Sequence, residues 1–165
     1  MATTERNLTI HDVVVPETPV PVRAATAAWF LAIGAGVAES VLGVIDALSS
    51  DSTPVAGVVA QVALRTIVYG GLFVVIDRYF RRGRGWSRPL LAVLLGVIGM
   101  ATLIASPIGW LANDRDFHAL DVDAGFVIFA VLRTIHVLAV IAGVVLMYRP
   151  EANRWFRAAA GSAWK

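Results

Sequence analysis

The sequence contains no cysteine and few charged residues. Without cysteine, the 165-residue chain has no disulfide, no iron–sulfur cluster and no thiol chemistry. Only 16% of its residues are charged, whereas about a quarter are charged in a typical soluble domain. Hydrophobic residues make up 58% of the chain, and its mean hydropathy is +0.72. Since the charges are too few to cover a soluble surface, we expect lipid to face most of the chain.

Motifs of known catalytic, nucleotide and metal sites are also missing. The strings G-x-x-x-x-G-K-[ST], G-x-G-x-x-G, H-E-x-x-H and G-x-S-x-G do not occur. The stretch from Asp114 to Asp123 holds four carboxylates but lacks the spacing and the glycine of an EF-hand. The sequence therefore predicts no enzyme, no bound cofactor and no metal site.

Four apolar segments are each close to the roughly 20 residues that cross a hydrocarbon core of about 30 Å. They cover residues 24–48, 54–76, 89–111 and 124–147. Pro54 and Pro89 suit the first turn of a helix, whereas Pro107 predicts a kink or an end in the third segment. The predicted fold is all-α, a four-helix transmembrane bundle over residues 24–148.

Arginine and lysine gather in the loop between the second and third segments and in both tails. The loop alone carries Arg78, Arg81, Arg82, Arg84 and Arg88. The positive-inside rule therefore predicts a multi-pass protein of the bacterial inner membrane with both termini cytoplasmic. The basic loop is also expected to attract anionic lipid at that face. It is too short to build the folded basic surface of a nucleic-acid-binding protein, so no nucleic-acid partner is predicted.

The two tails differ in character. Residues 1–23 lack the apolar core of a signal peptide and predict a disordered tail, extended from Glu17 to Val22. Residues 149–165 predict an amphipathic tail whose short helix starts at Pro150, with Trp155 and Phe156 dipping into the lipid. The string Pro-Glu-Ala-Asn-Arg-Trp-Phe from Pro150 resembles the Pro-x-x-Asn-x-aromatic-Phe tail of small, mostly uncharacterised actinobacterial multi-pass proteins. That resemblance covers residues 150–157, implies a bacterial inner-membrane location and implies no activity.

A short string occurs twice. Leu64-Arg65-Thr66-Ile67 in the second segment recurs as Leu132-Arg133-Thr134-Ile135 in the fourth. This predicts two repeated helical hairpins of the same orientation, related by a pseudo-two-fold axis along the membrane normal, as in some transporters. The alternative is coincidence among sequences dominated by valine, alanine, leucine and glycine.

Three charged residues fall inside the predicted spans. Because the spans alternate in direction, Glu39, Arg65 and Arg133 come to a similar depth near the middle of the membrane. An unpaired charge there costs at least about 2.5–3.5 kcal/mol, so each should face the bundle and find a partner. We predict that Glu39 lies between the two arginines and accepts from both.

Four further polar residues extend this cluster into a predicted network or pathway. Gln61 and Tyr69 lie one turn to either side of Arg65, and Asp46 lies two turns beyond Glu39 toward the outer mouth. His136, three residues after Arg133, is expected either to hydrogen-bond in the core or to titrate near neutral pH.

Two functions remain open at this point. In the first, the charges fix the register of a non-enzymatic structural or accessory subunit, which forms a homo-oligomer or joins a larger membrane complex. In the second, the protein is a small oligomeric transporter or channel that moves an anion or protons past Glu39, Arg65 and Arg133. Two arginines facing one carboxylate leave one positive charge over.

Overall fold

The computed structural model describes residues 17–49, 54–113 and 123–162, and within them it forms helices and no strand. The helices are α1 (Val20–Ser49), α2 (Val55–Val74), η1 (Val75–Phe80), α3 (Ser87–Leu91), η2 (Ala92–Gly99), α4 (Met100–Asn113), α5 (Ala124–Met147) and α6 (Pro150–Ser162); η1 and η2 are π-helical. Four stretches are long and apolar enough to cross a membrane: Val20–Ser49, Val55–Phe80, Ser87–Ala105 and Ala124–Met147. The predicted four-helix bundle is therefore confirmed, and the chain is an integral, multi-pass membrane protein.

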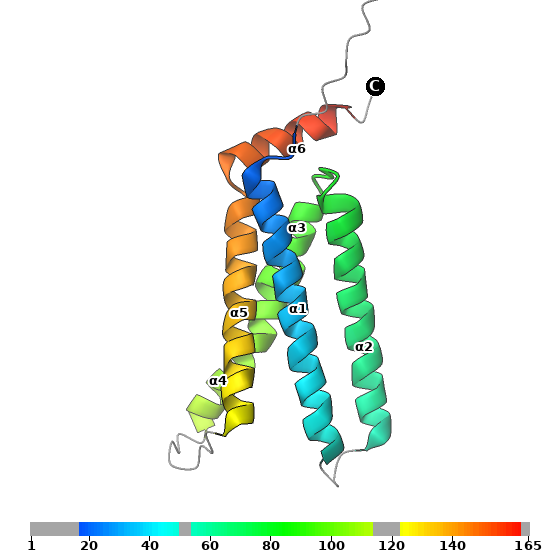
Figure 1. Cartoon of the computed structure of the whole chain (residues 1–165), viewed down its shortest axis with the longest axis vertical. Helices are drawn as coiled ribbons and strands as arrows, with labels where there is room; N and C mark the ends of the chain where they lie inside the picture. Colours follow the sequence, from blue (N-terminus) through cyan, green and yellow to red (C-terminus); the bar gives the residue numbers. More distant parts are fainter. Residues whose placement is uncertain (1–16, 50–53, 114–122, 163–165) are drawn as a thin grey trace, which may run out of the picture.

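Helix α1 is the centre of the bundle, packed closely along α5 and less closely along α2 (Figure 1). Trp29 of α1 is fully buried against Gly143 of α5. A Cβ atom at position 143 would lie 2.9 Å from the Trp29 ring, so only glycine allows this approach. The main apolar core, which includes Ile76 and Leu91, lies in the half of the bundle nearer to α6. The opposite half is packed more loosely.

The third span, residues 87–113, is formed by α3, η2 and α4 in succession. It contacts η1 at its start and α5 through η2, so it diverges from α2 along its length (Figure 1). Helix α4 continues through Pro107 to Asn113. Of the two outcomes predicted at Pro107, a kink or an end, the end is therefore wrong, because membrane helices tolerate proline where the freed backbone group finds another partner.

The structure also corrects or confirms two helix starts. Helix α1 begins at Val20, so the extended lead-in predicted up to Val22 is wrong for its last residues, and Val22 is buried. Residues 1–16 of the predicted disordered tail lie outside the described residues. Asp123 caps the start of α5, where its side chain accepts a hydrogen bond from the Phe126 amide at 2.7 Å.

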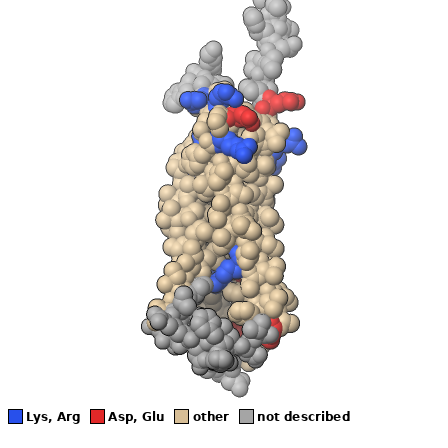
Figure 2. Space-filling model, turned by 90° about the vertical axis from the view of Figure 1, so that its left-hand side faces the viewer, with Lys and Arg blue, Asp and Glu red and all other residues tan. Residues whose placement is uncertain are grey.

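Helix α6 lies across one end of the bundle, as Figure 1 shows. It is longer than predicted and runs to Ser162. Phe156 packs on Phe80, with ring centroids 5.3 Å apart, and is buried inside the protein. Its predicted insertion into lipid is therefore wrong. We call this end of the molecule the basic end, because exposed arginines gather there (Figure 2): Arg81, Arg82, Arg84, Arg149, Arg154 and Arg157.

The repeated Leu-Arg-Thr-Ile string is not accompanied by repeated packing. If the two hairpins were equivalent, the close contact between α1 and α5 would have a counterpart between the third span and α2. Among the described residues, the third span meets the second only near its start, at η1, and has no comparably close contact with α2. The two copies of the string thus occupy different environments.

Candidate functional site

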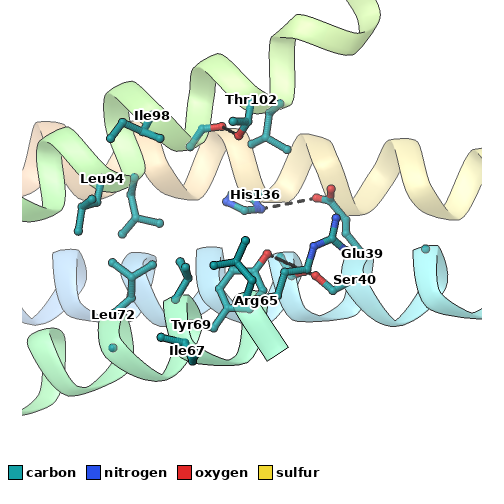
Figure 3. Close-up of a pocket in the computed structure, with 18 of the residues that line it drawn as sticks. Glu39, Ser40, Arg65, Ile67, Tyr69, Leu72, Leu94, Ile98, Thr102 and His136 are labelled. Atoms are coloured by element: carbon teal, nitrogen blue, oxygen red, sulfur yellow. Dashed lines mark hydrogen bonds and ion pairs between the residues drawn. The ribbon is translucent and has the colours of Figure 1, made fainter. Parts of the chain in front are cut away.

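A cavity of about 960 Å³ opens between α2 and the third span and borders the main apolar core at Leu72 and Leu95. Its inner wall consists of residues from α1 and α5, and its side walls are α2 and the third span. In Figure 3, Glu39, Arg65, Tyr69 and His136 point toward the space between the helices. Leu94, Ile98 and Thr102 of the third span face them. Most of the predicted polar cluster thus lines one cavity.

The three charged residues of the cavity lie at a common depth. Glu39 is ten residues before the end of α1 at Ser49. Arg65 is ten residues after the start of α2 at Val55, and Arg133 is nine residues after the start of α5. At about 1.5 Å per residue, each is roughly 15 Å from its helix end, which is close to the middle of a bilayer core.

Glu39 is shared by two groups of α5. Arg133 Nε lies 3.6 Å from Glu39 Oε2, and His136 Nδ1 lies 3.6 Å from Glu39 Oε1. Both distances are too long for hydrogen bonds, and Glu39 Oε1, Arg133 Nε and His136 Nδ1 are buried without a hydrogen-bond partner. The Arg133 guanidinium also lies 4.6 Å from the centroid of the Phe129 ring. The carboxylate and Arg133 are therefore an ion pair at close range.

Arg65 lines the same cavity but has no such partner. In residues 17–49, 54–113 and 123–162, its side chain makes no hydrogen bond and lies within 4.0 Å of no carboxylate. Its Nη1 lies 3.9 Å from the position that a Cβ atom at Gly43 would occupy, one turn beyond Glu39. The prediction that Glu39 bridges both arginines is thus wrong for Arg65, because the carboxylate turns toward α5.

Tyr69 ties α2 to α1 beside this charge cluster. Its hydroxyl donates to the Gly36 carbonyl at 3.1 Å and lies 3.4 Å from the Ser40 hydroxyl, which donates to the same carbonyl at 2.7 Å. A Cβ atom at position 36 would lie 2.8 Å from the Tyr69 hydroxyl and 3.0 Å from Cε1 of His136. Gly36 is therefore where α1 is pressed between α2 and α5.

Two predicted members of the network lie elsewhere. Asp46 and Gln61 are exposed, and neither lines the cavity. The sequence does not predict the contribution of the third span, whose Leu94, Ile98 and Thr102 form one wall of the cavity. The sequence gives only an indirect signal for that wall. The first, second and fourth spans carry charges, so the third span is needed to enclose them.

Comparison with known proteins adds no further information on this site. No family model, no curated protein and no solved structure matches the chain.

Proposed function

We propose that the protein is a non-enzymatic membrane protein that binds an anionic ligand in the cavity between α2 and the third span. The observation that supports this most directly is the guanidinium of Arg65, which lines the cavity while Glu39 is paired with Arg133. Such binding is the first step that the predicted anion transporter would need. Transport itself would require oligomerisation, since four spans are few for a closed pathway.

The charge balance of the cavity favours an anion over a neutral ligand. Its lining includes two guanidinium groups and one carboxylate, so with His136 neutral it carries one surplus positive charge. A charge at this depth costs about 2.5–3.5 kcal/mol or more when it is unpaired. A carboxylate or phosphate group on Arg65 would offset that cost, and a guanidinium binds both groups with two parallel hydrogen bonds.

The proposal includes the orientation of the protein in the membrane. The basic end faces the cytoplasm of a bacterial cell, in keeping with the positive-inside rule, and the arginines there contact anionic lipid. The cavity then runs from its charges, close to the midplane, toward the cytoplasmic side, where Leu72 and Val75 line it.

Thermal unfolding of the purified full-length protein in mild detergent tests this function. The panel of anions is inorganic phosphate, acetate, hexadecyl phosphate and hexadecanoate. We expect at least one of them to raise Tm in a concentration-dependent way, since a ligand that binds only the folded state stabilises it. Arg65→Gln should abolish the rise, while Arg82→Gln, which changes an exposed arginine of the basic end, should keep it. If no anion raises Tm, or if Arg65→Gln keeps the full rise, the proposal is wrong.

The exposure of α2 favours a second function, that of an accessory subunit in a membrane assembly. Only Val58 and Leu72 of α2 are buried, so most of this helix is available to another transmembrane segment. A carboxylate of a partner protein, or of a second copy of this chain, would then pair with Arg65. The two functions can be separated by extracting the tagged protein from its native membrane in mild detergent and measuring the mass of the intact complex. A stoichiometric foreign subunit supports the accessory role. In a homo-oligomer, the anion series on Arg65→Gln decides, since a carboxylate of a second copy on Arg65 would leave no rise in Tm for an added anion to cause.

A further inference from the structure

The cavity combines two chemically different regions. Toward α1 and α5 its wall holds Glu39, Arg133 and His136, with Arg65 and Tyr69 beside them (Figure 3). Toward its mouth the lining consists mainly of exposed aliphatic residues: Leu64, Ile67 and Val68 of α2, and Leu94 and Ile98 of the third span. A ligand that satisfies both regions has an anionic group at one end and a hydrocarbon portion at the other.

The mouth of the cavity opens sideways, toward lipid. Its rim residues also face the outside of the bundle, since Ile67 is 72% exposed and Ile98 is 52% exposed. Both residues lie within membrane-spanning stretches. Hydrocarbon, rather than water, therefore surrounds this opening. A small water-soluble anion would have to cross that hydrocarbon to enter here, whereas a molecule already dissolved in the bilayer has direct access.

Arg65 is also accessible from a second apolar groove. A cavity of about 500 Å³ lies between α1 and α2, and it is lined by Arg65, Ser40, Tyr69 and Thr66 among valine and isoleucine side chains such as Val41 and Val62. The guanidinium is thus bordered by apolar space in two directions. The main cavity alone is near the upper end of the range of about 300–1,000 Å³ for small-molecule sites, which is far more than an inorganic anion needs.

These observations point to one class of ligand. We infer that the cavity binds an amphiphile drawn from the bilayer, with a single phosphate or carboxylate group on Arg65 and a hydrocarbon chain between α2 and the third span. This inference rests on the proposed anion-binding function and specifies the source of the ligand. It places the anionic group near the middle of the membrane, deeper than the headgroups of either leaflet.

Photo-crosslinking in lipid nanodiscs tests this inference on the full-length protein. The probe is hexadecyl phosphate with a diazirine in its chain, presented in nanodiscs of phosphatidylcholine. We expect labelling of peptides from α2 and the third span, including those that hold Ile67 and Ile98. Unlabelled hexadecyl phosphate should compete, whereas hexadecanol and inorganic phosphate should not compete at a hundredfold excess. Arg65→Gln should lower the labelling at least tenfold, and Arg82→Gln should leave it unchanged.

The possible outcomes separate this inference from the function on which it rests. If inorganic phosphate competes as well as hexadecyl phosphate, the ligand is a soluble anion, and only the inference is overturned. If hexadecanol competes equally, the charge has no part in binding, and both are overturned. If the probe labels α2 and the third span no more than α6, the inference is wrong, and the thermal series with acetate and phosphate decides the proposed function by itself.

A second variant covers the case in which Arg65→Gln does not fold. Ile98→Trp fills the mouth of the cavity from an exposed position and leaves every charged group in place. We expect it to lower the labelling by the chain-bearing probe at least fivefold with little change in Tm. Undiminished labelling of Ile98→Trp would show that the hydrocarbon chain of the probe lies elsewhere and would overturn the inference.

Discussion

Arg133 Nε lies 3.6 Å from Glu39 Oε2, and this ion pair joins α5 to α1 at a depth where the bilayer offers no water. Arg65 occupies the matching position in the repeated Leu-Arg-Thr-Ile string, yet no carboxylate of the described residues lies within 4.0 Å of its guanidinium. Two identical tetrapeptides thus place one arginine in a structural pair and leave the other facing a cavity. This difference is the basis for assigning them separate roles.

The Glu39–Arg133 pair predicts a measurable coupling energy. Glu39→Gln leaves the Arg133 guanidinium buried without its carboxylate, which should destabilise the fold by about 1–3 kcal/mol. Arg133→Gln should have a similar effect, and the double variant should recover part of the loss. Unfolding in detergent gives the four free energies of the cycle. Arg81→Gln is the matched control, since its pair with Asp77 is exposed and worth at most about 1 kcal/mol. Strictly additive losses would show that the two groups do not interact.

The same substitution should act differently on ligand binding. Glu39→Gln removes the only carboxylate among the described residues that line the cavity, so the net charge of the cavity becomes more positive. At an effective dielectric constant near 20, two unit charges on opposite sides of such a cavity interact by roughly 1–2 kcal/mol. We therefore expect a variant that stays folded to bind hexadecyl phosphate about tenfold more tightly, as measured by its Kd in nanodiscs. Weaker binding by Glu39→Gln would contradict this electrostatic account of the cavity.

Gly36 and Gly34 provide a matched pair of tests for the packing beside the cavity. Gly36→Ala places a Cβ atom 2.8 Å from the Tyr69 hydroxyl and 3.0 Å from His136, and we expect a loss of about 1–3 kcal/mol. Gly34→Ala meets nothing within 4 Å, so the gain in helix propensity should stabilise the protein by about 0.5–1 kcal/mol. Thermal unfolding compares the two. Equal effects at both positions would mean that α1 is not pressed between α2 and α5.

The sequence was sufficient to predict the four spans and the depth of Glu39, Arg65 and Arg133, because hydropathy and residue spacing fix both. It did not predict which way each charge turns. In a soluble helix, the apolar stripe marks the buried face, but a membrane helix is apolar toward both lipid and core. The direction of Glu39 toward α5 depends on the contacts of Gly36 and Gly143, where missing side chains let helices approach. Such contacts between distant residues leave no periodic signal.

Arg88 holds α6 against the end of the bundle. Its Nη2 donates to the Met147 carbonyl at 2.8 Å and to the Asn153 side chain, and its guanidinium lies over the rings of Tyr148 and Phe156. Arg88→Lys keeps the charge but loses the planar group that makes these contacts together. We expect faster hydrogen exchange throughout α6, by about tenfold, with α5 unchanged.

Arg82→Lys serves as the control for that measurement, because Arg82 is an exposed arginine of the same loop. It should leave the exchange of α6 at the wild-type rate. If Arg88→Lys also leaves α6 protected, then the contact of Phe156 with Phe80 is enough to hold the helix, and Arg88 has no fastening role.

The orientation of the spans can be tested cleanly because the chain has no native cysteine. Arg84→Cys puts a single thiol in the exposed loop of the basic end, and Ser49→Cys puts one at the exposed end of α1 on the opposite side of the bundle. With the basic end cytoplasmic, a membrane-impermeant maleimide added to intact bacterial cells without an outer-membrane barrier should label Ser49→Cys and spare Arg84→Cys. Lysis should then make both thiols reactive, which controls for local accessibility. The reverse pattern in intact cells would place the arginines outside, and the positive-inside rule would then fail for this protein.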